Sequence, residues 1–230
     1  MPVETQSLAT AATQAVRIAL GSGAAPCVTC SFQAEDMVVL ELVRREWPAI
    51  PVLFLETGYH FAEVYAYRDA MASRYALNLI NLTADRTVAE QESQFGLLYE
   101  SAPDRCCKLR KVEPLFRALA GYDVWFTGLR RVQSPTRANL EVVDSFLLPG
   151  GRRIPKISPL AHWTDRDVWQ FAAANDIPLL SLYEQGYTSI GCEPCTQKPL
   201  NVSDPRSGRW AGRKLECGIH IEAPVAAAKD

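Results

Sequence analysis

Short apolar runs with the composition of β-strands alternate with helical patterns along the first half of the chain. Helical spacing of apolar residues follows the first two runs, and a third helical pattern precedes the fourth run. Alternation of this kind predicts an α/β fold with a mainly parallel sheet and flanking helices. The four expected strands span 26–32, 52–58, 77–83 and 123–130.

Three further segments have clear boundaries in the sequence. Residues 1–23 have the pattern of an amphipathic helix that ends at a glycine, and residues 142–157 read as a β-hairpin around Pro-Gly-Gly. Residues 164–176 predict a helix that begins with a capping box. Glycine and proline become frequent toward the end of the chain, so we expect one α/β domain over 1–200 and a mobile tail over 201–230.

The composition narrows the class of protein. With 230 residues and 48% hydrophobic content, the chain can bury a core without disulfides. Its net charge of −2 gives no reason to expect nucleic-acid binding, and its apolar runs are too short to span a membrane. Seven cysteines without an export signal predict a reducing, cytoplasmic location. The oligomeric state stays open, a homo-oligomer included.

Four of the cysteines form two local pairs. Cys106 and Cys107 are adjacent, and Cys192 and Cys195 form a C-x-x-C motif. Brought together by folding, four thiolates can hold Zn²⁺ or an iron–sulfur cluster. Two adjacent residues cannot easily point at one tetrahedral ion, whereas a cluster spreads its ligands over four irons, so the adjacent pair favours iron. A structural zinc site and unrelated thiols remain the alternatives.

The other three cysteines divide into a pair and a single residue. Cys27 and Cys30 also form a C-x-x-C motif, but on an expected core strand, where a free cysteine behaves as a small hydrophobic residue. Cys217 lies in the expected tail between a basic pair and His220. Because nearby cations lower the pKa of a thiol, Cys217 is a candidate nucleophile; the alternative is an incidental surface cysteine.

Polar loops follow three of the expected strands. They span 31–36, 56–60 and 128–137, and in a parallel sheet such loops meet at the carboxyl edge, where ligands bind. The last loop is rich in arginine, whose guanidinium binds phosphate or sulfate through paired hydrogen bonds. Individually, such cations are also compatible with a solvated surface. Further cations flank the cysteines: Lys108, Arg110, Lys111, Arg206 and Arg209.

Six motifs together resemble the assimilatory sulfonucleotide reductases, which are the adenylyl-sulfate (APS) and phosphoadenylyl-sulfate (PAPS) reductases. In chain order they are SFQAED, LETGYHF, CCKLRK, GLRRVQSPTR, GCEPC and ECGIH. The resemblance covers about residues 27–221 and implies an adenine-nucleotide α-hydrolase-like (PP-loop) fold. Residues 1–200 would bind nucleotide and cluster, and the tail 201–230 would carry the catalytic cysteine. Two departures are mild: Glu56 replaces the usual aspartate, and RKLEC replaces the commoner K-T-E-C.

The resemblance also implies roles for individual residues. Cys217 would be the nucleophile, and Cys106, Cys107, Cys192 and Cys195 would hold a [4Fe–4S] cluster. Reductases with these cysteine pairs generally prefer APS. The implied substrate-binding residues are Ser31, Phe32, Gln33, Leu55, Thr57, Gly58, Lys111, Gly128, Arg130, Gln133, Ser134, Arg137, Arg206, Arg209 and His220.

The implied reaction reduces APS to sulfite and AMP through an S-sulfocysteine, for cysteine biosynthesis, with reduced thioredoxin or glutaredoxin as partner. Three alternatives remain. A PAPS or dual-specificity reductase would need a further basic contact for the 3′-phosphate. An ATP-using PP-loop tRNA thiolase would need the glycines that SFQAED lacks. An iron–sulfur redox sensor would need neither the arginine loop nor Cys217.

Overall fold

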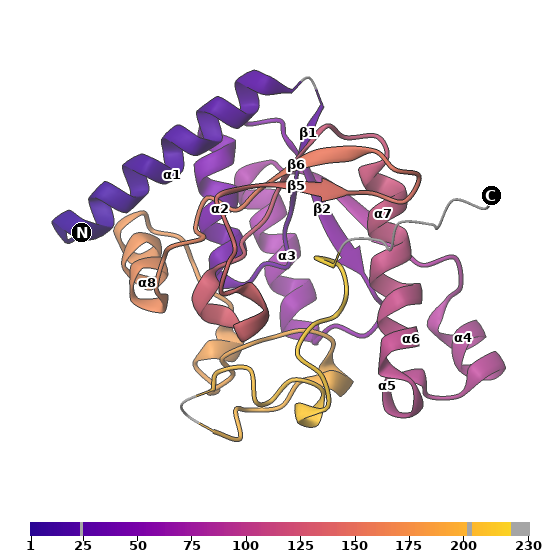
Figure 1. Cartoon of the computed structure of the whole chain (residues 1–230). Coiled ribbons are helices and arrows are strands. Elements are labelled where there is room, and N and C mark those ends of the chain that lie inside the picture. The colour runs from indigo at the N-terminus through magenta and orange to yellow at the C-terminus, as the bar shows by residue number, and fades with distance from the viewer. Residues whose placement is uncertain (24, 202–203, 222–230) are drawn as a thin grey trace.

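A six-stranded sheet in the order β3-β2-β1-β4-β6-β5 forms the centre of the computed structural model, which describes residues 1–23, 25–201 and 204–221 (Figure 1). Neighbouring strands pair in parallel except β5 with β6, which form the expected antiparallel hairpin. The predicted α/β fold with a mainly parallel sheet is therefore confirmed. The strands are β1 (Pro26–Thr29), β2 (Pro51–Glu56), β3 (Asn78–Thr83), β4 (Val124–Phe126), β5 (Val143–Leu147) and β6 (Arg153–Ile157).

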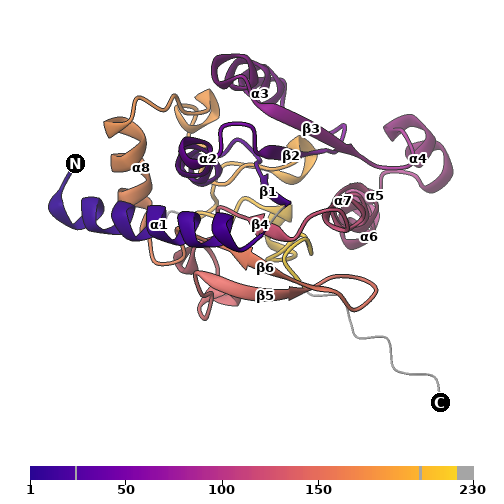
Figure 2. The same cartoon turned by 90° about the horizontal axis from the view of Figure 1, so that it is seen from above.

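Helices cover both faces of this sheet (Figure 2). One face carries α1, α2, α3 and α8, and the other carries α7. None of the helices in the described ranges is long and apolar enough to cross a membrane. Their bounds are α1 (Val3–Ser22), α2 (Ala34–Glu46), α3 (Ala62–Tyr75), α4 (Val88–Phe95), α5 (Leu98–Ser101), α6 (Pro103–Cys107), α7 (Glu113–Leu119) and α8 (Asp165–Ala174).

The alternation of side chains along the central strands builds two cores. In β4, Trp125 packs with Leu115 and Leu119 of α7, whereas its neighbours Val124 and Phe126 pack on the opposite face. Successive residues of a strand point to opposite faces, so a short apolar strand feeds both cores. The sheet is thereby held rigidly from both sides, with its carboxyl edge left for polar loops.

A π-helical turn, Lys108–Val112, joins α6 to α7. Such turns insert an extra residue into a helix and occur often at functional sites. Here the turn follows directly after Cys106 and Cys107 and contains Lys111. The segment that leads into it, with α4 and α5, was not anticipated from sequence. The expected capping box of α8 is present, with the Asp167 N–H donating to Thr164 Oγ1 at 3.3 Å.

Candidate active site

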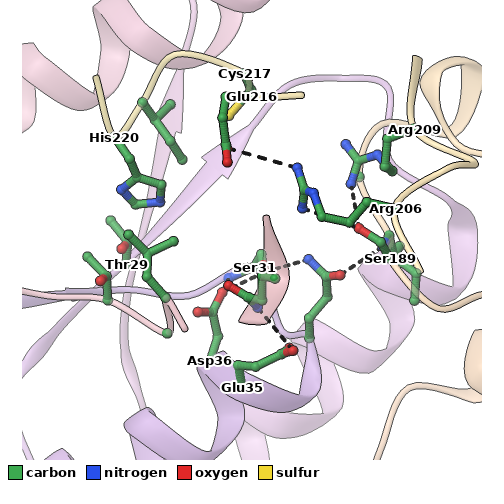
Figure 3. A pocket seen from close by; sticks show the side chains of 18 of the residues that line it. Thr29, Ser31, Glu35, Asp36, Ser189, Arg206, Arg209, Glu216, Cys217 and His220 are labelled. Atoms are coloured by element: carbon green, nitrogen blue, oxygen red, sulfur yellow. Dashed lines mark hydrogen bonds and ion pairs between the residues drawn. The ribbon is translucent and has the colours of Figure 1, made fainter. Parts of the chain in front are cut away.

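A cavity of about 200 Å³ lies at the carboxyl ends of β1, β2 and β4. Side chains that follow these strands meet in its wall, and residues of the tail close another side (Figure 3). The sequence-predicted residues that line it are Ser31, Gln33, Leu55, Lys111, Gly128, Arg130, Gln133, Arg137, Arg206, Arg209, Cys217 and His220.

Asp36 organises the loop between β1 and α2. The N–H and hydroxyl of Ser31 donate to Asp36 Oδ2 at 2.6 and 2.5 Å. Burial raises the pKa of Asp36 to about 6, although the hydrogen bonds from Ser31 oppose this shift. A Cβ at Gly128 would lie 2.2 Å from Asp36 Oδ1, so the loop after β4 can approach α2 this closely only with glycine there.

Gln33 and Tyr183 join the same loop to later parts of the chain. The Ile190 N–H donates to Gln33 Oε1 at 2.8 Å, and Gln33 Nε2 donates to Ser31 Oγ at 3.1 Å. The Ala34 N–H, at the start of α2, donates to Tyr183 Oη at 3.0 Å. These bonds fix the far wall of the cavity to the segment that leads into the second cysteine pair.

The charge of Arg130 is engaged inside the protein. This residue is 2% exposed, and its Nη2 donates to Glu35 Oε1 at 2.6 Å and also to Asp165 Oδ1. Arg130 borders the cavity, yet it links the start of α2 to the start of α8. Two carboxylates pair with Arg130, and its role as an anion ligand stays a prediction.

Arg137 is also paired, but with the tail. It contacts Glu216 through two hydrogen bonds, and its Nη1 donates to Gln133 Oε1 at 2.5 Å. Gln133 in turn donates to Glu35 Oε1 at 3.1 Å. The arginine loop is thus preorganised by carboxylates and amides.

Three cations that are less closely paired stand beside Cys217. Among the described residues, no carboxylate lies within ion-pair distance of Lys111 or Arg209, and Arg206 approaches Glu216 only to 3.9 Å. Burial and the neighbouring charges of Arg137 and Arg209 lower the pKa of Arg206 to about 10. Like charges that are held together and partly desolvated favour a bound anion.

His220 forms another part of the wall. Its ring stacks on Trp125 with centroids 5.3 Å apart, and its buried Nδ1 has no hydrogen-bond partner among the described residues. Burial and the nearby charges of Arg137, Lys156 and Arg206 hold the pKa of His220 well below its usual value. The imidazole is therefore neutral at neutral pH, with a free nitrogen beside the cavity.

Cys217 lies between the cavity and a second, outer groove of about 640 Å³. Its side chain is half-buried. Apolar side chains of Val112, Phe116 and Pro149 line the groove, with charged residues at its rim. The thiol therefore borders two spaces, the cavity at the carboxyl edge of the sheet and the outer groove.

The four paired cysteines line one small cavity of their own. Cys106 and Cys107 lie at the end of α6, and Cys192 and Cys195 flank a short 3₁₀ turn. Burial and the nearness of the other three thiols raise the pKa of Cys106 to about 12. Folding therefore brings together the two pairs that are 85 residues apart in sequence, counted from Cys107 to Cys192.

Two cations lie between the cysteine cavity and the cavity that contains Cys217 in its wall. Lys111 and Arg209 line both. Burial lowers the pKa of Lys111, but thiolate charge at Cys192, Cys217 and Cys107 outweighs it, and the pKa is raised. In the described residues, no group of three or more potential ligands is arranged around a single metal ion.

Four of the sequence-predicted substrate residues lie outside the cavity wall. Phe32 is a core residue with 0% exposure, and it packs edge-on against Phe54. Thr57 accepts a hydrogen bond from Cys192 Sγ at 3.4 Å, so it supports the cysteine cavity instead. Gly58 and Ser134 shape turns: Gly58 has φ +73°, and the hydroxyl of Ser134 bonds the hydroxyl of Thr136.

Several residues of the site were missed from sequence. Glu35 and Asp36 stand in the SFQAED motif and form part of the first turn of α2, where two acids are a signal for the start of a helix. Tyr183 and Glu216 had no local signal, because their partners are 149 and 79 residues away. Cys27 and Cys30 are buried in the core, as predicted.

Comparisons with known proteins agree with this geometry. The family model described as phosphoadenosine phosphosulfate reductase domain matches residues 25–198. The adenosine 5′-phosphosulfate reductase of Mycolicibacterium smegmatis is 48% identical over 189 residues, covering 81% of this chain and 79% of that protein. The enzyme of the same name from Mycobacterium tuberculosis is 46% identical over 208 residues, covering 86% of this chain and 80% of that protein.

A solved structure gives the same picture. The phosphoadenylyl-sulfate reductase of Candida auris, in a phosphate complex, superposes with a TM-score of 0.69 at 25% identity, covering 86% of this chain and 98% of that one. The family model and both relatives support one assignment. The chain belongs to the phosphoadenosine phosphosulfate reductase domain family.

Proposed function

We propose that this protein reduces adenosine 5′-phosphosulfate to sulfite and AMP, with Cys217 as the nucleophile. One observation carries the proposal: the Cys217 side chain lies in the wall of the cavity at the carboxyl edge of the sheet, beside Lys111, Arg206 and Arg209. The names of its mycobacterial relatives supply the substrate. As in those proteins, the expected product is sulfite for sulfur assimilation.

The first half-reaction forms a bond between Cys217 and the substrate. The Cys217 thiolate attacks the sulfur of the sulfate group, the S–O bond to the phosphate breaks, and AMP leaves with the bonding electrons. Cys217 becomes an S-sulfocysteine. Arg206, Arg209 and Lys111 stabilise the charge that develops on the departing phosphate, because they stand preorganised in a partly desolvated site.

The second half-reaction requires a thiol from outside the protein. A thiolate of reduced thioredoxin or glutaredoxin attacks Sγ of Cys217, sulfite leaves, and a mixed disulfide forms. The second thiol of the partner then resolves it, so the partner supplies both electrons. The outer groove beside Cys217 offers the approach. The tail predicted over 201–230 would present this cysteine, and its residues 202–203 and 222–230 lie outside the described residues.

We propose that Cys106, Cys107, Cys192 and Cys195 hold a [4Fe–4S] cluster in the cysteine cavity. Four thiols around a shared space match a cluster whose irons are separate, and Lys111 and Arg209 would offset its negative charge. When bound, such a cluster would supply structural cross-linking and a fixed electrostatic field. No electron needs to pass through it. A reducing, cytoplasmic compartment would preserve these thiols.

The ion pairs of Arg130 and Arg137 in the arginine loop favour APS over PAPS as the substrate. The extra 3′-phosphate of PAPS needs a free cation, whereas Glu35 and Asp165 neutralise Arg130, and Glu216 neutralises Arg137. The cations that remain beside Cys217 match a phosphosulfate. An ATP-using thiolase is less well supported, since the loop over residues 31–36 has no glycine to hold a pyrophosphate.

The test is sulfite release by the anaerobically purified protein with reduced thioredoxin. APS is expected to be turned over and PAPS only weakly, and Cys217→Ser is expected to abolish turnover while retaining AMP binding. Faster turnover of PAPS would reassign the substrate. Full activity of Cys217→Ser would contradict the proposed mechanism.

A further inference from the structure

Glu216, the residue before Cys217, is held by the arginine loop. Its Oε2 accepts from Arg137 Nη2 at 2.7 Å, and its Oε1 accepts from Arg137 Nε at 2.9 Å. The Thr136 hydroxyl also donates to Oε1 at 2.9 Å. Paired bonds of this kind fix both distance and orientation, which a single ion contact does not.

The pair is shielded from water. The side chains of Arg137 and Glu216 are 11% and 13% exposed. Although burial opposes it, the neighbouring charges of Arg137 and Arg206 lower the pKa of Glu216, so the carboxylate stays ionised. By contrast, the Arg131–Glu141 pair at 2.7 Å on the same loop is 33% and 62% exposed. An exposed pair contributes little, whereas breaking a buried one leaves an unpaired charge.

Glu216 and Cys217 together separate the inner cavity from the outer groove, since both residues line both spaces. Figure 3 shows Glu216 and Cys217 together on the tail, with a dashed line from Glu216 to Arg206, whose Nη2 lies 3.9 Å from Glu216 Oε2. Two further contacts hold the tail beside Glu216: Lys214 Nζ donates to Asp104 Oδ1 at 2.5 Å, where the Asp104 side chain is 89% exposed, and Arg213 Nη1 donates to the Glu100 carbonyl at 2.9 Å. The Arg137–Glu216 pair differs from these contacts because both of its charged side chains are largely buried and because it involves the residue directly before the nucleophile.

We infer that Glu216 is the positioning residue that docks the tail: its ion pair with Arg137 sets Cys217 against the substrate cavity, and its release frees Cys217 for the partner thiol. The inference rests on the proposed function. It also gives Arg137 a new role. Arg137 holds the tail, whereas Lys111, Arg206 and Arg209 hold the substrate anion.

This role is distinguishable from direct substrate binding. If Arg137 and Glu216 form an anchor, losing either one slows the attack by Cys217 and leaves nucleotide affinity unchanged. If Glu216 merely occupies an anion site until substrate arrives, its removal tightens nucleotide binding. If Arg137 is a substrate ligand, its removal weakens that binding.

The experiment compares Glu216→Gln, Glu216→Asp and Arg137→Gln with the control Glu141→Gln in the cluster-containing protein. Three quantities are measured: AMP affinity, the rate of Cys217 sulfonation at saturating APS without reductant, and the rate of Cys217 alkylation by iodoacetamide. Circular dichroism verifies that each variant is folded.

Glu216→Gln and Arg137→Gln are expected to slow sulfonation about 10- to 100-fold, the effect of losing a charged hydrogen-bonded pair. AMP affinity should stay within about twofold, and alkylation should become faster. Glu216→Asp should recover part of the sulfonation rate, and Glu141→Gln should match the wild type in all three measurements.

Unchanged sulfonation and alkylation in Glu216→Gln would overturn the anchor, as would a large change in AMP affinity. Alkylation and AMP binding need no sulfonation. If the wild type formed no adduct with APS, the proposed reaction would fail, while faster alkylation of Glu216→Gln would still establish the docking contact.

Discussion

Two C-x-x-C motifs in this chain have the same spacing but lie in different surroundings, one in the core and one around a cavity. Cys27 and Cys30 are 0% and 2% exposed and belong to different cores, one on each face of the sheet. Cys192 and Cys195 line a shared cavity. The difference lies in the backbone: residues three apart on an extended segment point to opposite faces, whereas on a 3₁₀ turn they lie on the same side.

Hydrogen bonds maintain each conformation. The Cys30 N–H donates to the Leu53 carbonyl at 3.0 Å, which extends the pairing of β1 with β2. The Cys195 N–H donates to the Cys192 carbonyl at 3.0 Å, which closes the turn. A cysteine spacing therefore indicates a metal site only when the local backbone turns both side chains toward the same space.

The largest expected effect is a difference in iron content between variants of the two motifs. Cys195→Ser removes one of four cluster ligands, so it should lose most of the iron and the activity. Cys30→Ala leaves the cysteine cavity intact and should retain both. Iron analysis and the visible absorption of anaerobically purified protein measure this. Iron loss in Cys30→Ala together with retention in Cys195→Ser would reverse the comparison.

The second effect concerns stability. Cys27→Ser places a hydroxyl beside Trp125 and Leu115, where apolar side chains surround it. Burying an unpaired hydroxyl costs about 1–3 kcal/mol, so the free energy of unfolding should fall by that amount. Urea denaturation measures the change, with Cys27→Ala as the control that lacks the hydroxyl. Loss of iron without loss of stability would assign Cys27 to a site instead of the core.

The third effect follows from the buried carboxyl near Cys30. The pKa of Asp36 is about 6 in the folded protein, against about 3.9 in the unfolded chain. Because the folded protein binds this proton more tightly, the stability that it contributes is fully present below about pH 4. This contribution is lost as the pH rises through about 6. From pH 5 to 7, wild type should lose about 1 kcal/mol relative to Asp36→Asn. Parallel pH profiles of unfolding would contradict this shift.

The smallest expected effect lies at the edge of the cysteine cavity. Thr57→Val removes the acceptor of the Cys192 thiol bond of 3.4 Å and keeps the shape of the side chain. A net hydrogen bond contributes about 1 kcal/mol, so cluster loss in air should accelerate a few-fold. Thr57→Ser should behave as the wild type. Equal lifetimes in all three proteins would exclude a role for this hydroxyl.

Much of the fold followed from local patterns. The strands ending in Thr29, Glu56 and Phe126 were found because each is a short apolar run before a polar loop. The helix Val88–Phe95 was missed, although Thr87 and Glu90 form a capping box that the T-x-x-E pattern signals. Its burial pattern is weak, with Gln91 as its buried residue, so hydrophobic periodicity gave no signal.

The site was only partly predictable, because its electrostatics depend on distant partners. The clustering of Arg137 and Arg206 with Cys217 followed from motifs, but the neutralisation of Arg137 did not. Arg130 meets Glu35 from 95 residues away, and Arg137 meets Glu216 from 79 residues away. The local spacing of residues in the sequence does not indicate such distant pairs. They decide which arginines remain available for a substrate anion.

The most direct test of the central claim is to map the sulfonated residue. The anaerobic protein is incubated with APS without reductant, and its peptides are analysed by mass spectrometry. A single sulfonate on Cys217, released as sulfite by reduced thioredoxin, is the expected result, with Cys27 and Cys30 unmodified. A sulfonate on another cysteine, or no adduct with either APS or PAPS, would contradict the account.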